Sequence, residues 1–181
     1  GMTVINPCDF NQTKAATIAI AEYYGPVYLR FGRPAVPNFT DPNQKFEIGK
    51  ALLLNEGNDV SIFATGHLVW KAIEAGHILA EKGINAEIIN IHTIKPLDAE
   101  AILNSARKTR AVVTAEEHMF NGGLGDSICQ LLSRNFPLPV EMVGVNDKFG
   151  ESGTPDELMK KYGIDTPNIV EAALKAISRK N

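Results

Sequence analysis

The stretch Glu116-Glu117-His118 sets two carboxylates beside an imidazole, a combination that can transfer protons between reacting groups. It follows an apolar run at 111–115, which predicts that the three residues lie where a strand ends. In open α/β sheets, ligands gather beyond the carboxyl ends of the strands. Neighbouring residues in an extended chain point apart, however, so one centre cannot easily use all three side chains. We therefore favour a structural or interface role over acid–base chemistry.

A glycine-rich turn follows, with Gly122, Gly123 and Gly125 around the start of an expected helix at 124–135. A dinucleotide-binding G-x-G-x-x-G run would need glycine where the sequence has Ile128. The glycines instead predict a tight turn and a close approach of the helix to the sheet. Together with the preceding Glu-Glu-His stretch, they form a candidate interface or loop site.

Arg33 follows a second apolar run, at 27–31, and is therefore expected at the exit of a parallel strand. A planar guanidinium at this place can bind a phosphate or a carboxylate, and a surface ion pair is an equally good interpretation. Arg30 is expected on the other side of the sheet. His67 comes directly before a predicted helix, and we favour a capping or exposed role for it over anion binding.

The remaining candidates for chemistry are isolated. His77 is expected on a helix surface and His92 in a loop. Cys8 and Cys129 lie too far apart to suggest a disulfide framework or a metal knuckle, and free thiols in a reducing compartment are the simpler interpretation. No set of His, Cys, Asp and Glu has the spacing of metal ligands. We therefore assign no catalytic, cofactor-binding or metal-binding residue from the residues alone.

Composition restricts the class of protein further. The 181 residues are 44% hydrophobic and 22% charged, with a net charge of -3, which excludes disorder and coiled coil. The charges are dispersed, so neither nucleic acid nor a membrane surface is an expected partner. No apolar run reaches the roughly 20 residues of a membrane span. A cytoplasmic location is the expectation.

The first third of the sequence predicts a strand–helix–strand unit at 1–33. A strand at 3–6 precedes a helix that begins at Asp9, with Gln12 in a capping-box position, and a second strand follows at 27–31. Residues 34–46 are rich in proline and predict a linker. Since the first unit is too small to bury a core, we expect the polypeptide that packs beside it to be missing from this sequence.

Residues 47–181 predict a three-layer α/β/α domain with a mostly parallel sheet. Its first two strands, at 50–54 and 60–64, are joined by five residues and therefore predict an antiparallel hairpin. Strands and helices then alternate, with strands at 86–91, 111–115 and 140–145 and helices at 67–82, 98–108, 124–135, from 154 and 166–179.

The order of these motifs resembles the C-terminal section of transketolase. The stretches 3–9 and 27–34 resemble the end of its pyrimidine-binding domain, and 93–98, 114–125 and 149–158 resemble its C-terminal domain. Deoxyxylulose-phosphate synthases and the beta subunits of 2-oxoacid dehydrogenases share this layout. The Ile-Lys-Pro-Leu-Asp stretch at 94–98 and the Glu-Glu-His stretch favour transketolase.

The resemblance implies transfer of a two-carbon ketol unit between sugar phosphates in the pentose phosphate pathway. The family uses thiamine diphosphate, held by a divalent metal, at an active site between the subunits of a homodimer. Arg33 matches the arginine of the family that binds the sugar phosphate, whereas His67 stands where the family has serine or another small residue.

The residues of the family that bind the cofactor and the metal have no counterpart in this sequence. We therefore expect a C-terminal section that works with the N-terminal part of transketolase, on the same or a separate chain, and is inactive alone. Alternatives are the corresponding section of the two related enzymes, or a non-catalytic assembly or regulatory module that binds through 116–125.

Overall fold

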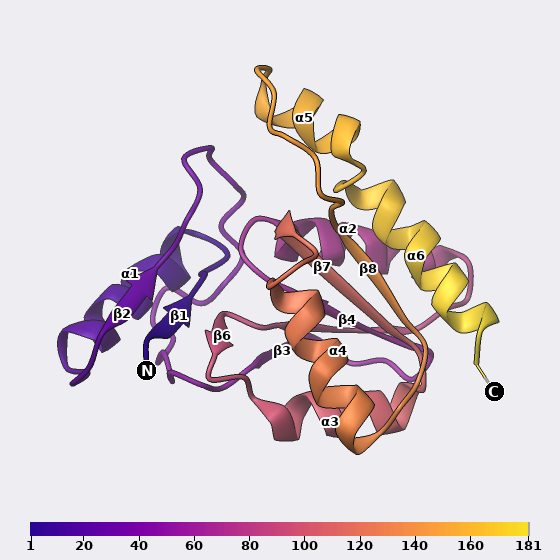
Figure 1. Cartoon of the computed structure of the whole chain (residues 1–181), viewed down its shortest axis with the longest axis horizontal. Helices are drawn as coiled ribbons and strands as arrows, with labels where there is room; N and C mark the ends of the chain where they lie inside the picture. The colour runs from indigo at the N-terminus through magenta and orange to yellow at the C-terminus, as the bar shows by residue number, and fades with distance from the viewer. Residues whose placement is uncertain (181) are drawn as a thin grey trace.

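The computed structural model, which describes residues 1–180, contains two β-sheets and six α-helices (Figure 1). The strands are β1 (Thr3–Ile5), β2 (Val27–Leu29), β3 (Leu52–Asn55), β4 (Val60–Ala64), β5 (Ala86–Asn90), β6 (Thr93–Lys95), β7 (Val112–Met119) and β8 (Val140–Val145). The helices are α1 (Phe10–Ala21), α2 (Leu68–Glu81), α3 (Ala99–Thr109), α4 (Leu124–Asn135), α5 (Pro155–Tyr162) and α6 (Thr166–Ser178).

The larger sheet has the strand order β3-β5-β4-β7-β8, and all of its pairs are parallel except β3 with β5. Successive residues of β4 point to opposite faces. Ile62 therefore packs in the cluster that α2 and α6 cover, and Phe63 packs in the cluster that α3 and α4 cover. This burial on both faces confirms the predicted three-layer domain with one antiparallel strand.

The predicted hairpin between the first two strands of this sheet is wrong. β3 pairs with β5, so that Leu52 lies opposite Asn90, while both edges of β4 are occupied by β5 and β7. The connection crosses the start of β5, and a Cβ on Gly57 would lie 2.3 Å from the backbone carbon of Ala86. The short connection therefore predicted correctly that β3 runs opposite to β4. It predicted the wrong partner, because β3 pairs with β5.

The smaller sheet has the order β2-β1-β6. β1 and β2 are parallel and joined by α1, as the strand–helix–strand prediction requires. The antiparallel strand β6 was not predicted, and its pairing of Lys95 with Val4 attaches the first unit to the rest of the chain. β2 remains an edge strand among residues 1–180.

The predicted linker at 34–46 contains neither helix nor strand. Asp9 holds this segment, because its carboxylate accepts hydrogen bonds from Thr40 N at 2.8 Å, Thr40 Oγ1 at 2.7 Å and Phe39 N at 3.0 Å, besides capping α1 through Gln12 N. Burial works to raise the pKa of Asp9, but these hydrogen bonds outweigh it and hold the pKa below the usual value. The segment is thus tied to α1 along its middle.

The first unit exposes an unusual share of large apolar side chains. Within its first 31 residues these are Met2, Phe10, Ile18, Tyr23, Tyr24, Tyr28 and Phe31. We call this set the N-terminal apolar surface. Only Ile5, Ala16 and Phe46 are buried in the cluster beneath it. No helix within the described part of the chain has the length and apolar character needed to cross a membrane.

Candidate functional site

β7 runs further than the apolar pattern predicts. The strand continues to Met119, so Glu116, Glu117 and His118 lie inside it and not beyond its end. The register against β8 is irregular between Ala115 and Met119. The predicted strand end at residue 115 is therefore four residues too early, because polar side chains extend the ladder without extending the apolar run.

Glu116 is a buried cap for α4. The residue is 2% exposed, and its two carboxylate oxygens accept hydrogen bonds from Leu124 N at 2.7 Å and Gly125 N at 2.8 Å. These are N–H groups that the helix itself leaves unpaired. Burial raises the pKa of Glu116, and the two N–H groups only partly offset that rise. This geometry commits Glu116 to the start of α4.

Packing explains two of the three glycines of the turn, and backbone conformation explains the third. A Cβ on Gly123 would lie 2.3 Å from Glu116 Oε2, and one on Gly125 would lie 2.8 Å from Thr114 Oγ1 in β7. Gly122 has a φ of 76°, in the left-handed region that favours glycine. The turn therefore needs glycine at these positions for backbone and packing reasons.

Glu117 points the other way, to the start of α2. Its Oε2 lies 3.1 Å from His67 Nδ1, and its backbone oxygen accepts a hydrogen bond of 2.6 Å from Arg30 Nη2. The hydrogen bond from His67 lowers the pKa of Glu117 against the effect of burial, and the charges of His67 and Arg30 lower it further. This contact joins β7 to the segment that leaves β2.

The expected role of His67 is therefore wrong. Its side chain makes no capping hydrogen bond with α2 and is only 10% exposed. The imidazole instead covers Gly32, where an added Cβ would lie 2.0 Å from Cε1 of the ring. Nothing in the sequence marks this contact, because it joins residues that lie 35 positions apart.

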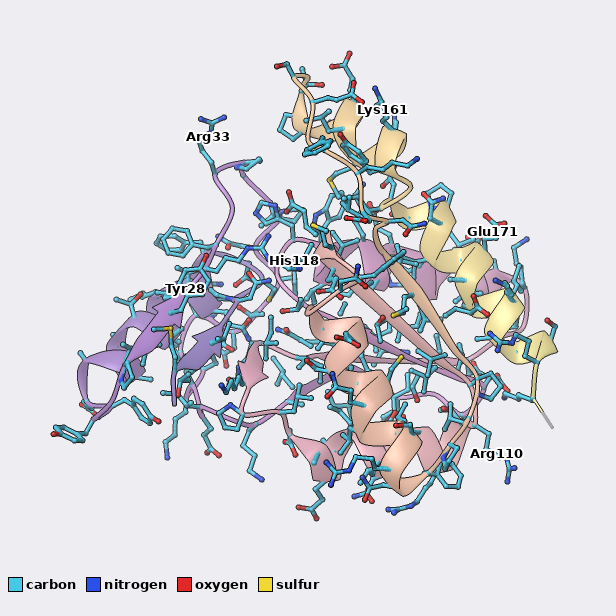
Figure 2. All side chains as sticks on the ribbon, in the orientation of Figure 1. Tyr28, Arg33, Arg110, His118, Lys161 and Glu171 are labelled. Atoms are coloured by element: carbon cyan, nitrogen blue, oxygen red, sulfur yellow. The ribbon has the colours of Figure 1, made fainter. Side chains whose placement is uncertain are left out.

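Arg33 and His118 are both exposed and lie apart (Figure 2). The Arg33 side chain extends outward from the loop after β2, and no hydrogen bond or ion pair joins it to another residue among 1–180. His118 Nδ1 lies 3.0 Å from Met119 O. The structure thus brings Glu116 and the glycines together, brings Glu117 to His67, and leaves Arg33 separate.

Two cavities flank the junction of the two units. One, of about 670 Å³, is lined by Tyr28 of β2, by residues of α4, and by three cationic side chains that the sequence did not group, Arg30, Lys95 and Arg134. The other, of about 430 Å³, lies beside the loop after β2 and includes His67 and Cys8. Burial strongly raises the pKa of the Cys8 thiol, so this cysteine is not a reactive thiolate.

A metal-held cofactor does not fit the residues that the structure describes. Among residues 1–180, no three or more His, Cys, Asp or Glu side chains gather to hold a cation. Both cysteines in this range are free. Residues 1–180 therefore do not by themselves form a site of three such ligands for a metal ion.

Comparison with known proteins identifies the larger unit. Residues 49–169 match the family described as "Transketolase, C-terminal domain". The chain belongs to the transketolase family. A 6-deoxy-6-sulfo-D-fructose transketolase subunit, SqwH, of Clostridium sp. (strain MSTE9) is 48% identical over 181 residues, which cover 100% of this chain and 56% of that protein. A subunit of the apulose-4-phosphate transketolase of Phocaeicola vulgatus is 39% identical over 99% of this chain and 57% of that protein.

A solved structure shares the fold of almost the whole chain. It is described as "Split gene transketolase, inactive beta4 tetramer", with a TM-score of 0.97 and 46% identity over 99% of this chain and 59% of that chain. This chain therefore spans a little over half the length of the relatives that it matches.

Proposed function

We propose that this chain is the C-terminal part of a thiamine-diphosphate-dependent transketolase. It would take part in transfer of a two-carbon ketol unit between sugar phosphates, as in the pentose phosphate pathway. The observation that carries the proposal is the 48% identity along the full chain to a transketolase subunit. Bound thiamine diphosphate supplies the carbanion chemistry of such enzymes, and in this proposal another part of the protein holds it with its divalent metal.

The proposal divides the chain at the linker. Residues 1–33 are the end of a pyrimidine-binding domain, 34–46 the linker and 47–181 the transketolase C-terminal domain. The N-terminal apolar surface and the open edge of β2 support this division, because an isolated unit of this size buries too little surface to be stable. The N-terminal part of the transketolase, on the same or a separate chain, is the partner we assign to this surface.

Assembly and location complete the proposal. We assign the intact enzyme, which contains both its N-terminal and its C-terminal part, to a homodimer. We place it in the cytoplasm, in keeping with the free thiols of Cys8 and Cys129.

A reconstitution assay tests the function. The purified chain is given thiamine diphosphate, Mg²⁺, a ketose phosphate and an aldose phosphate, with and without the remaining part of the protein. We expect ketol transfer only in the complete mixture. Transfer by the chain alone would contradict the proposed division of labour, and no transfer in either mixture with any phosphorylated or sulfonated ketose would contradict the function.

Arg33 is the residue we assign to the terminal anionic group of the sugar. Its guanidinium is exposed, while Pro34 restricts the backbone of Arg33, so the side chain can make a bidentate contact with such a group. The names of the relatives include both a sugar phosphate and a sulfonated sugar, so the two anions are compared.

In the intact protein, Arg33→Ala is expected to raise the Michaelis constant for D-fructose 6-phosphate by about 10- to 150-fold, from the loss of hydrogen bonds to a charged group. D-Fructose, which lacks the anion, serves as the control substrate and should be unaffected. The Michaelis constants of the wild type and Arg33→Ala are also measured with 6-deoxy-6-sulfo-D-fructose, which shows which anion the site prefers. Unchanged Michaelis constants for both anionic sugars would remove Arg33 from the site.

A further inference from the structure

The segment that carries Arg33 is held at two places by the C-terminal domain. Arg30 Nη2 donates to the backbone oxygen of Glu117 at 2.6 Å, and the His67 ring lies over Gly32. Arg30 N also donates to Ile5 O at 2.8 Å, which keeps the segment in line with β1. Arg33 comes one residue after Gly32, over which the His67 ring lies.

The His67 ring is itself fixed from behind. Glu117 Oε2 lies 3.1 Å from its Nδ1, and the side chain is 10% exposed. Because the Glu117 carboxylate is the acceptor, Nδ1 carries the proton, and the orientation of the ring is set. Any side chain at position 32 would overlap the ring, with a Cβ lying 2.0 Å from Cε1 and 2.5 Å from Nε2. The imidazole and the glycine therefore form one packed contact between the two units.

Arg33 has no such support of its own. No hydrogen bond or ion pair with residues 1–180 fixes its guanidinium, so its direction follows from the backbone on either side. Pro34 restricts that backbone on one side, and Gly32 beneath the His67 ring restricts it on the other. Both residues line the cavity of about 430 Å³ that also includes His67.

We propose that His67, held by Glu117, is a positioning residue that fixes the backbone at Gly32 and thereby aims Arg33 at the anionic end of the substrate. This inference rests on the proposed function of Arg33. A residue that pre-orders a binding loop lowers the entropy cost of binding without touching the ligand. Its loss should therefore affect the anionic sugar and spare the neutral one.

The test compares D-fructose 6-phosphate with D-fructose in the intact protein. His67→Ala is expected to reduce the preference for the phosphorylated sugar, measured as the ratio of the two kcat/KM values, by about 3- to 10-fold. His67→Gln, which keeps an N–H donor for Glu117, should restore part of it. His77→Ala, on the exposed surface of α2, is the matched control and should leave the ratio unchanged.

A double variant separates positioning from general damage. In an Arg33→Ala background, His67→Ala should cause no further loss of phosphate preference, since the guanidinium that it aims is gone. In His67→Ala, an equal loss of kcat/KM for both sugars would overturn the positioning role alone. The same holds if Arg33→Ala lowers the ratio of the two kcat/KM values and His67→Ala leaves it unchanged. An unchanged ratio in Arg33→Ala would overturn the proposed role of Arg33, and the positioning role with it, while the reconstitution assay would still test the proposed function separately.

Hydrogen exchange gives a readout that needs no turnover. The amide of Arg30, which donates to Ile5 O, should exchange about 10-fold faster in His67→Ala than in the wild type, because an unfixed loop opens more often. His77→Ala should leave it unchanged. Exchange that is the same in His67→Ala and the wild type would show that the ring does not hold this segment, and would overturn the inference.

Discussion

The two units of this chain differ in how completely they bury their apolar side chains. The larger unit encloses two clusters, one on each face of its sheet, which include Ile62 and Phe63 of adjacent strand positions. The cluster beneath the first unit buries only Ile5, Ala16 and the linker residue Phe46, and the seven side chains of the N-terminal apolar surface are exposed. The contrast indicates a closed domain joined to a surface that is suited to a further polypeptide.

The largest expected effect comes from matched phenylalanines in the two units. Phe63 is 0% exposed, and Phe63→Ala should reduce the free energy of unfolding of the chain by about 3–5 kcal/mol through the cavity that it leaves. Phe31 is 59% exposed, and Phe31→Ala should change that free energy by at most about 0.5 kcal/mol. Urea unfolding followed by the fluorescence of Trp70 measures both, and similar losses would break the comparison.

A pH effect is expected where the two units meet. His92 is buried, and its ring centroid lies 4.2 Å from that of Phe46. Burial lowers the pKa of His92 to about 4, and the negative charge of Asp98 only partly opposes this shift. As the pH falls below about 6.5, the unfolded chain takes up a proton that native His92 does not, so the chain becomes less stable. The loss of unfolding free energy approaches about 3 kcal/mol, and it is complete once the pH passes below the pKa of His92 in the native chain.

His92→Gln should remove this part of the pH dependence between pH 7 and 4. The measurement is the difference in free energy of unfolding between the variant and the wild type across that range. His77→Gln, at an exposed position of α2, is the control. A wild-type curve parallel to that of His92→Gln would show that His92 titrates normally in the native chain.

A smaller effect is expected at the turn before α4. An added methyl group on Gly123 would overlap the Glu116 carboxylate, so Gly123→Ala should cost about 1–3 kcal/mol of unfolding free energy. A Cβ on Gly150 would meet no atom within 4 Å, and Gly150→Ala should therefore stay within about 0.5 kcal/mol. Thermal unfolding compares the two, and equal costs would contradict the capping arrangement.

The sequence predicted those elements whose signals are local. The bounds of α4 and β8 were predicted correctly, because apolar periodicity acts within a few positions. The partner of β3 was predicted incorrectly, since pairing depends on which edges other strands already occupy. β6 was missed because three residues carry too little periodicity.

The candidate site shows the same limit. The alternation of Glu116 and Glu117 to opposite faces follows from the geometry of a strand and was expected. The contact of His67 with Gly32 joins residues 35 positions apart, and no local pattern marks it. The phosphate role of Arg33 came from resemblance alone, since its place after a strand suits a surface ion pair equally well.

The central claim is that another part of the protein covers the first unit. Amide hydrogen exchange of β1, α1 and β2, measured in this chain alone and in the intact protein, tests it most directly. We expect these amides to exchange at least about 10-fold more slowly in the intact protein, while those of β4 and β7 keep their protection. Equal protection of β1, α1 and β2 in both states would contradict the claim.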